Sequence, residues 1–268
     1  HPDYAMSLNN LAAFYKLLGN YEKADTIYKD VLTIYKEAFG EANSNYISSL
    51  ISYAGLNFSL GNFDLSEKYY LHAKELTEKA LGKSHSSYAD CIHYLAKVYH
   101  IKGDLPKAET HYRLAEEIIQ GGELEFSLDY AEIEHSLGEF YLSTHDFQMA
   151  ESKFLNSAEI QSKILGDRSD TYGLSLSSLA LACEALGKFQ ETEKMLDKAS
   201  AIKRKSLSNA QSFLSQKELT NFTATFQQDG FQLASFLYSR HAHNNHYNVL
   251  AAQHYNYALF YKGYLLSS

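Results

Sequence analysis

The sequence has 268 residues, of which 45% are hydrophobic and 21% charged, with 2 prolines and no tryptophan. This composition is ordinary for a globular protein and argues against linker-rich and β-rich chains. The formal net charge of −8 at pH 7 argues against partners with anionic surfaces, so we expect neither nucleic-acid binding nor membrane binding.

The two cysteines, Cys91 and Cys183, lie far apart in the sequence and make no disulfide framework, which predicts a reducing, cytoplasmic compartment. No run of about 18 apolar residues occurs, and the first residues carry no signal-peptide pattern. The abrupt start inside a repeat and the apolar ending "YKGYLLSS" lead us to expect a segment of a longer protein.

Steps of 42 residues return to the same kinds of residue along the chain. From Gly19 they reach Gly61, Gly103, His145 and Gly187; from Tyr21, Phe63, Leu105, Phe147 and Phe189; from Tyr28, Tyr70, Tyr112, Phe154 and Leu196. Such a period indicates an array of structural repeats. We therefore divide residues 1–207 into five units, about 1–42, 43–84, 85–126, 127–168 and 169–207.

Each unit predicts two helices joined by a turn at the glycine. In the first unit, apolar residues recur at helical spacing from Leu8 to Leu18 and again from Tyr21 to Tyr35. Two helices with so short a connection must be antiparallel neighbours. Small residues recur where they let the two helices approach closely, at Ala12, Ala54, Ala96, Gly138 and Ala180, and opposite them at Ala24 and its equivalents.

The boundaries between units repeat as well. A tyrosine recurs just inside each first helix, and Ser, Asp or Asn nearby offers a helix N-cap. Gly40, Gly82 and Gly166 are predicted to close second helices, whereas Gly121 and Gly122 come early and predict a distorted third junction. Because no pair can bury its apolar faces alone, we expect the pairs to stack into an all-α, right-handed superhelical solenoid.

This pattern resembles the tetratricopeptide repeat in a long form, close to that of the kinesin light chain. The resemblance covers about residues 1–207 and rests on small and aromatic positions such as Ala12, Tyr15, Ala24 and Tyr28, and on "HPDYAMSLNNLA". HEAT and armadillo repeats have a similar period but lack this order of glycine, aromatic, small and aromatic residues.

The repeat fades in residues 208–268. One possibility is a degenerate sixth repeat, since Phe231, Ala234 and Tyr238 echo the pattern of the second helix. The other, which we favour, is a helical hairpin of residues 210–241 and 246–266. Either would cap the apolar end of the array.

The ending "YNYALFYKGYLL" is similar to the segment before the caspase-like CHAT domain in bacterial proteins that join it to tetratricopeptide repeats. This resemblance implies that the chain is the N-terminal repeat module, with the catalytic His and Cys beyond Ser268. It implies a role in regulating such an attached domain.

The sequence carries no pattern typical of an active site or cofactor site. It has no Gly-rich phosphate loop, no H-E-x-x-H and no G-x-S-x-G. His241, His243, His246 and His254 match no closed metal site, so we expect a polar loop there. We predict no enzyme activity, no cofactor and no metal.

The resemblance implies that the first helices line a concave groove. Projecting that register gives Met6, Asn9, Asn10, Ala13 and Lys16, and the residues at steps of 42 from them. From this set our candidate peptide-binding residues are Asn9, Asn10, Lys16, Ile51, Phe58, His93, Tyr94, Lys97, His100, Glu132, His135 and Glu139. Amides can hydrogen-bond a peptide backbone and apolar side chains offer pockets, so the ligand would be a peptide or a helix. We do not expect a clamp for a terminal carboxylate, because only Lys16 and Lys97 supply cations.

Three hypotheses follow. The leading one is a non-catalytic scaffold that binds a protein or peptide partner in the groove. The second is an autoinhibitory segment of an enzyme, with no separate partner. The third, nucleic-acid binding at the basic run that includes Lys203, Arg204 and Lys205, conflicts with the acidic balance of the chain.

Overall fold

The computed structural model describes residues 2–122, 126–210, 212 and 215. The chain forms two compact units, His1–Phe140 and Tyr141–Ser268, which we call unit 1 and unit 2 and treat separately. Helix α7 crosses the boundary between them.

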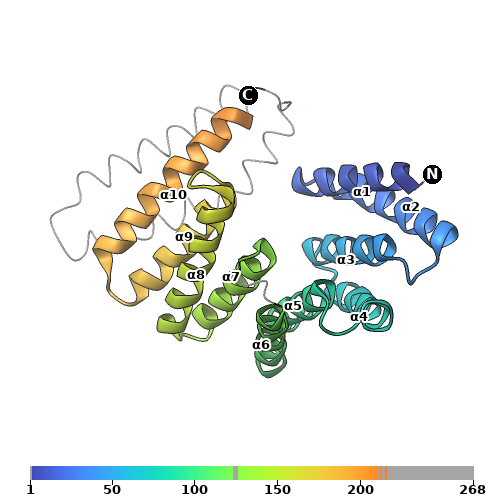
Figure 1. Ribbon diagram of the computed structural model, residues 1–268. Coiled ribbons are helices and arrows are strands. Elements are labelled where there is room, and N and C mark those ends of the chain that lie inside the picture. Colours follow the sequence, from blue (N-terminus) through green and yellow to red (C-terminus); the bar gives the residue numbers. More distant parts are fainter. Residues whose placement is uncertain (1, 123–125, 211, 213–214, 216–268) are drawn as a thin grey trace. The chain divides into compact units, whose positions relative to one another are not determined.

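The described residues form helices in sequence-adjacent pairs (Figure 1). Their bounds are α1 Pro2–Leu17, α2 Tyr21–Phe39, α3 Ser44–Ser59, α4 Phe63–Ala80, α5 Ser86–Ile101, α6 Leu105–Gly121, α7 Leu128–Ser143, α8 Phe147–Leu165, α9 Asp170–Ala185 and α10 Phe189–Ala210. The odd-numbered helices are the first helices of the 42-residue repeats, and the even-numbered helices are the second helices. This confirms the all-α solenoid of helix pairs that the 42-residue period predicts. None of the described helices combines the length and the apolar character that a membrane span requires.

The turn inside each pair needs a left-handed backbone. Gly19, Gly61, Gly103 and Gly187 have φ between 69° and 80°, a region that glycine enters without steric cost. His145 occupies the same place in the fourth turn with φ 67°. The 42-residue glycine series therefore marks one recurring turn geometry, which His145 adopts against the preference of a residue with a Cβ.

Small side chains lie at the close contact inside each pair. Ala12, Ala54, Ala96, Gly138 and Ala180 are all buried, as are their counterparts Ala24, Ser66, Ala108, Ala150 and Thr192. The Ser66 hydroxyl donates a hydrogen bond of 2.9 Å to the carbonyl of Ala54, so even a polar member of the set is satisfied. A larger side chain here would force the helices apart, at a cost of about 1–3 kcal/mol.

Within each of the two units, helix pairs also pack on the next pair in the chain. Val31 and Tyr35 of α2 form a core with Tyr46 and Leu50 of α3, and Tyr28 lies with its ring centre 6.2 Å from that of Tyr53. The same arrangement joins α4 to α5 through Tyr70, Leu95 and Val98. In unit 2, Ala158 of α8 packs against Tyr172 and Leu176 of α9. Every second helix in these junctions therefore buries a face of the following first helix.

Side chains cap the starts of α3, α5 and α9. The side chains of Asn43 and Ser169 accept hydrogen bonds from backbone N–H groups at the starts of α3 and α9. His85 does the same for α5 through Nδ1, which accepts from the N–H of Ser87 at 3.2 Å. A histidine cap is outside the Ser, Asp or Asn set that the sequence suggested.

Several sequence predictions concern residues that the structure does not describe. The third junction includes residues 123–125, between Gly122 and Phe126. The C-terminal hairpin or sixth repeat and the four histidines of residues 241–254 also fall outside the described part. The last described helix, α10, ends at Ala210, three residues beyond the end of the predicted repeats.

Candidate functional site

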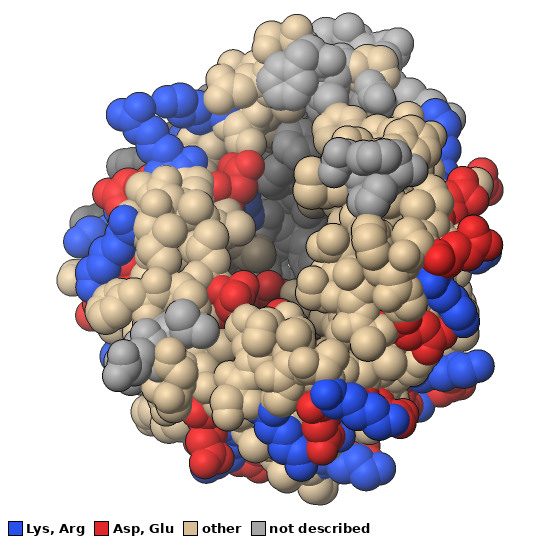
Figure 2. All heavy atoms as spheres, turned by 45° about the vertical axis from the view of Figure 1, so that its right-hand side comes forward, with Lys and Arg blue, Asp and Glu red and all other residues tan. Residues whose placement is uncertain are grey.

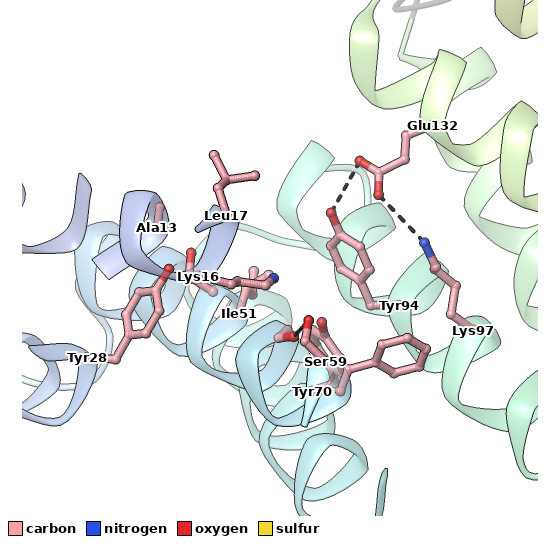
Figure 3. A pocket seen from close by; sticks show the side chains of 13 residues that line it. Ala13, Lys16, Leu17, Tyr28, Ile51, Ser59, Tyr70, Tyr94, Lys97 and Glu132 are labelled. Carbon is pink, nitrogen blue, oxygen red and sulfur yellow. Dashed lines mark hydrogen bonds and ion pairs between the residues drawn. The ribbon is translucent and has the colours of Figure 1, made fainter. Parts of the chain in front are cut away.

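A cavity of about 550 Å³ lies on the first-helix side of unit 1 (Figure 3). It is lined by Ala13, Lys16, Leu17, Tyr28, Ile51, Ser52, Gly55, Phe58, Ser59, Tyr70, Tyr94, Lys97 and Glu132. Most of this surface comes from α1, α3 and α5, with the tyrosines of α2 and α4 beneath and Glu132 of α7 at the edge. The volume lies within the range of about 300–1,000 Å³ that is typical of ligand pockets.

The Lys16 ammonium lies over the floor of this cavity. A methyl group at Gly55 would stand 3.1 Å from Lys16 Nζ and 3.2 Å from the hydroxyl oxygen of Tyr70, so the missing side chain makes room for both groups. Burial lowers the pKa of Lys16 below its ordinary value; Glu132 opposes this effect and Lys97 adds to it. No ion pair to Lys16 is made by the residues that the structure describes. The cavity therefore holds a partly buried amine with spare hydrogen-bond donors.

The Glu132 carboxylate, at the edge of the cavity, already has partners within unit 1. Glu132 accepts a hydrogen bond from the Tyr94 hydroxyl at 3.3 Å and lies 4.0 Å from Lys97 Nζ, as the dashed lines in Figure 3 show. The Tyr94 ring stacks on Tyr70 with centres 5.3 Å apart. Burial, followed by the Glu132 charge, raises the pKa of both tyrosines, so both hydroxyls stay protonated at neutral pH.

The structure brings together half of the residues predicted for the groove. Lys16, Ile51, Phe58, Tyr94, Lys97 and Glu132 line the cavity. Asn9 and Asn10 lie earlier on α1 and are not part of its lining; Asn10 is exposed, and Asn9 is half-buried. A ligand that reached both amides would have to extend along α1 beyond the cavity.

The prediction that His93 faces an open groove needs correction. His93 is only 2% exposed, and its Nε2 lies 2.8 Å from the hydroxyl oxygen of Ser136 on α7. Burial lowers its pKa well below the ordinary value, with smaller contributions from Lys97 and His135. The imidazole is therefore a neutral packing group between α5 and α7, because the approach of α7 covers the side of α5 on which His93 lies.

The other predicted residues of this region are also part of the packing or lie beyond the cavity. His100 is half-buried, with its ring centre 5.4 Å from that of Phe140. His135 is half-buried, and burial lowers its pKa to about 4. Glu139 is exposed on α7. None of these three lines the cavity.

Sequence reasoning missed part of the lining. Tyr28 and Tyr70 belong to the 42-residue series and not to the residues that the register projects onto the groove; both are almost fully buried, yet both also form the cavity floor. Leu17 and Ser59, at the ends of α1 and α3, also lie outside that projection and line the cavity. The signal that points to Tyr70 is Gly55, because a methyl group there would stand 3.2 Å from the Tyr70 hydroxyl oxygen.

One cluster in unit 2 has donor atoms that could hold a metal ion. Atoms of Glu151, Cys183 and Glu191 all lie within 4.8 Å of one another. However, both Glu151 oxygens accept hydrogen bonds from Lys188 Nζ, at 2.6 and 2.7 Å. Burial, followed by the Glu151 charge, raises the pKa of Cys183 to about 11, so the thiol is protonated. A metal would have to displace both the lysine and the thiol proton, and we assign the cluster to an ion pair.

Basic and acidic side chains are interspersed on the face shown in Figure 2. Among the described residues, some opposite charges are neighbours on one helix, such as Lys29 with Asp25 at 2.7 Å and Lys79 with Glu75 at 2.6 Å. Pairs at this spacing stabilise a helix locally.

Comparisons with known proteins agree with this architecture. Family profiles described as tetratricopeptide repeat match residues 5–45, 46–120 and 129–205. A search of curated protein sequences finds no match.

Among solved structures, a kinesin light chain of Podosopora anserina with nearly identical TPR-like repeats is 22% identical, with a TM-score of 0.55 over 77% of this chain and 98% of that one. BtubC from P. vanneervenii is 20% identical, with a TM-score of 0.62 over 80% of this chain and 83% of that one. A Rap protein complexed with Competence and Sporulation Factor is 18% identical, with a TM-score of 0.66 over 97% of this chain and 73% of that one. Identities this low bear on the fold alone. The family profiles cover more than half of the sequence, and the chain belongs to the tetratricopeptide repeat family.

Proposed function

We propose that this chain is a non-catalytic scaffold that binds a peptide or a helix of a protein partner in the cavity of unit 1. The observation that carries this proposal is the cavity of about 550 Å³ walled by α1, α3 and α5. It combines apolar lining with the Lys16 amine, which no described residue pairs. A concave apolar site with a few polar groups is the usual form of a ligand site.

The family supports the same function. Tetratricopeptide repeat proteins are typically non-catalytic scaffolds, and their fold suggests protein or peptide partners. The similar Rap protein was solved in a complex with Competence and Sporulation Factor. For this chain, a partner bound through its first helices is the corresponding proposal.

Three side chains would contact the ligand in different ways. Phe58 and Ile51 would contact an apolar side chain of the ligand, and Lys16 would donate hydrogen bonds to a backbone carbonyl or a carboxylate beside it. Lys97 is already close to Glu132, so it would contribute less. The binding energy is therefore expected to depend most on Phe58 and Lys16.

The test uses peptides selected from a random display library on the full chain. For a selected peptide, Phe58→Ala and Lys16→Glu should each raise the dissociation constant by at least about tenfold, or about 1.4 kcal/mol. Isothermal titration calorimetry measures the change. Lys68→Glu is the matched control, because Lys68 is exposed on α4 and does not line the cavity.

Equal affinities for the wild type and both cavity variants would place peptide binding elsewhere. His93 cannot serve in this test because its burial would turn a charge reversal into a folding defect. The helical circular dichroism signal of Lys16→Glu should match that of the wild type.

The alternative, an autoinhibitory module of an enzyme, rests on the resemblance of residues 255–266 to the segment before CHAT domains. In that case the chain would regulate an attached caspase-like domain in a bacterial protein. The two buried free thiols, Cys91 and Cys183, fit a reducing, cytoplasmic compartment. Sequencing the gene downstream decides the matter: a stop codon directly after Ser268 would remove this alternative and leave the peptide-binding proposal standing.

A further inference from the structure

A second cavity, of about 260 Å³, lies in unit 2 between α8, α9 and α10. Its apolar surface includes Leu155 of α8, Leu176 and Leu179 of α9, and Met195 of α10. It belongs to a different unit from the peptide site and does not depend on the proposed function.

One equivalent junction in unit 1, that of α2 with α3 and α4, is filled by aromatic side chains instead. Steps of 42 residues relate Leu179 to Tyr53 and Met195 to Tyr69. In unit 1 the rings of Tyr53 and Tyr69 meet with centres 5.0 Å apart. In unit 2 a leucine and a methionine replace this aromatic pair, and the space of two rings is left partly empty. Met195 is half-buried and unbranched, so it can adjust to a guest.

The rim of the cavity carries more positive than negative charge. Lys194 and Lys198 of α10 lie there with Glu159 of α8. The Glu159 carboxylate has its own partner, Lys163, at 4.0 Å. Lys198 donates a hydrogen bond of 2.7 Å to the Tyr172 hydroxyl and lies 3.6 Å from Asp167. Lys194 makes no ion pair with any residue that the structure describes.

These observations limit the ligand by size, polarity and charge. A volume of 260 Å³ lies just below the range of about 300–1,000 Å³ that holds drug-sized molecules, so one or two fused rings would fit. The walls left by two missing aromatic side chains suit a planar apolar group. The lysines at the rim suit an anion attached to that group.

We propose that the cavity between α8, α9 and α10 binds a small aromatic carboxylate. Its ring would lie between Leu176, Leu179 and Met195, and its carboxylate would accept hydrogen bonds from Lys194 and Lys198. The ligand would thus fill the place that Tyr53 and Tyr69 occupy in unit 1.

Methyl NMR of the full chain, labelled with ¹³C at the methionine methyl groups, tests this directly. The chain has three methionines, Met6, Met149 and Met195, and Met195→Leu assigns the signal of interest. Titration with 2-naphthoate should shift the Met195 signal with saturation below about 1 mM. The signals of Met6 and Met149, which do not line the cavity, should stay in place.

Two variants and one analogue separate the parts of the proposal. Leu179→Tyr combined with Met195→Tyr restores the aromatic pair of unit 1 and should weaken 2-naphthoate binding at least about tenfold, measured by calorimetry. Lys194→Gln, an exposed change that leaves the core intact, should weaken binding by about three- to tenfold. The uncharged 2-naphthamide should bind the wild type more weakly than the acid, by a similar factor.

The proposal is overturned if 2-naphthoate leaves the Met195 signal unmoved, or if it moves all three methionine signals alike. It is also overturned if the amide binds as tightly as the acid, since the lysines would then have no role. Because Lys194→Gln does not touch packed residues, a folding defect of the double tyrosine variant leaves the test complete.

Discussion

The two ends of the first-helix side of unit 1 use the same repeat positions differently. At α1 and α3 the position that faces the groove holds Ala13 and Gly55, and a cavity opens there. At α5 and α7 the same position holds Lys97 and Glu139, and the neighbouring His93 is buried against Ser136. The register therefore decides which side a residue faces, whereas the approach of a neighbouring helix decides whether that side is covered, as α7 covers His93.

The two ends also differ in how polar groups are satisfied. Lys16 keeps spare donors in the cavity, whereas His93 is bonded to Ser136, and burial, followed by the Lys97 charge, lowers the pKa of both His93 and His135. A buried polar group with a partner stabilises a unique packing, and an unpaired one is available to a ligand. We therefore assign His93 and Ser136 at the α5–α7 end to packing and propose the α1–α3 end, with Lys16, for binding.

The largest expected effect comes from opening the α5–α7 end. His93→Ala removes a buried ring and leaves the Ser136 hydroxyl without its partner, so the free energy of unfolding of unit 1 should fall by about 2–4 kcal/mol. Urea denaturation followed by circular dichroism measures it. Asn10→Ala, an exposed change on α1, should cost less than about 0.5 kcal/mol. A loss below about 1 kcal/mol for His93→Ala would show that the ring is not part of the packing.

The pH dependence of the unfolding free energy should distinguish two groups at the α5–α7 end, His135 and Asp90. The pKa of His135 is lowered to about 4 by burial and by Lys97, with Glu132 opposing. Between that value and its ordinary 6.5 the unfolded state binds more protons, so this group makes the fold less stable as the pH falls. Each such group changes stability by at most about 1.4 kcal/mol per pH unit.

Asp90 of α5 has the opposite effect over an overlapping range. Burial, together with Asp129 and Glu132, raises its pKa from 3.8 to about 7, so the folded state binds more protons between these values. Its contribution to stability is therefore lost as the pH rises through 7. Asp90→Asn should stabilise the protein by about 1 kcal/mol at pH 8 and should steepen its acid destabilisation.

His135→Gln gives the complementary measurement, since it should flatten or reverse the loss of stability between pH 6.5 and 4. Urea midpoints at several pH values would distinguish the two variants. Parallel profiles for Asp90→Asn, His135→Gln and the wild type would mean that neither group titrates in this way.

The smallest expected effect is at the α1–α3 end. Gly55→Ala gains about 1 kcal/mol of helix propensity, but its methyl group would lie 3.1 Å from Lys16 Nζ and 3.2 Å from the Tyr70 hydroxyl oxygen. Lys16 can swing aside and Tyr70 is packed, so the net change in unfolding free energy should stay within about 1 kcal/mol. A thermal melt measures it. A loss of more than about 2 kcal/mol would indicate that the cavity floor is as tightly packed as the α5–α7 end.

Most of the fold follows from the sequence because its determinants are local and repeated. Three features recur every 42 positions: the glycine turns, the small residues such as Ala12 and Ala54, and the alternation of helices. Each repeat therefore supports the assignment of the others. The cap by His85 could not be foreseen, because histidine caps helices only when its ring nitrogen happens to reach the free N–H.

The site is less predictable because its shape depends on side chains from several helices. The projection along each first helix includes Lys16, Ile51 and Phe58, which line the cavity. It could not show that α7 would cover His93, or that Tyr70 would form the core and the cavity floor together. These outcomes depend on the distances between helices of neighbouring repeats, and a 42-residue sequence period does not determine those distances.

The stacking of each pair on the next has a consequence for synthesis. The hydrogen bond between His93 and Ser136 spans 43 positions, and the cores of α2 with α3 and of α4 with α5 join adjacent helices. Bringing together residues so close in the sequence costs less entropy than closing a longer loop, and such contacts form quickly. A nascent chain can therefore begin to bury its tyrosines when two helix pairs have left the ribosome, long before its C-terminal residues are translated.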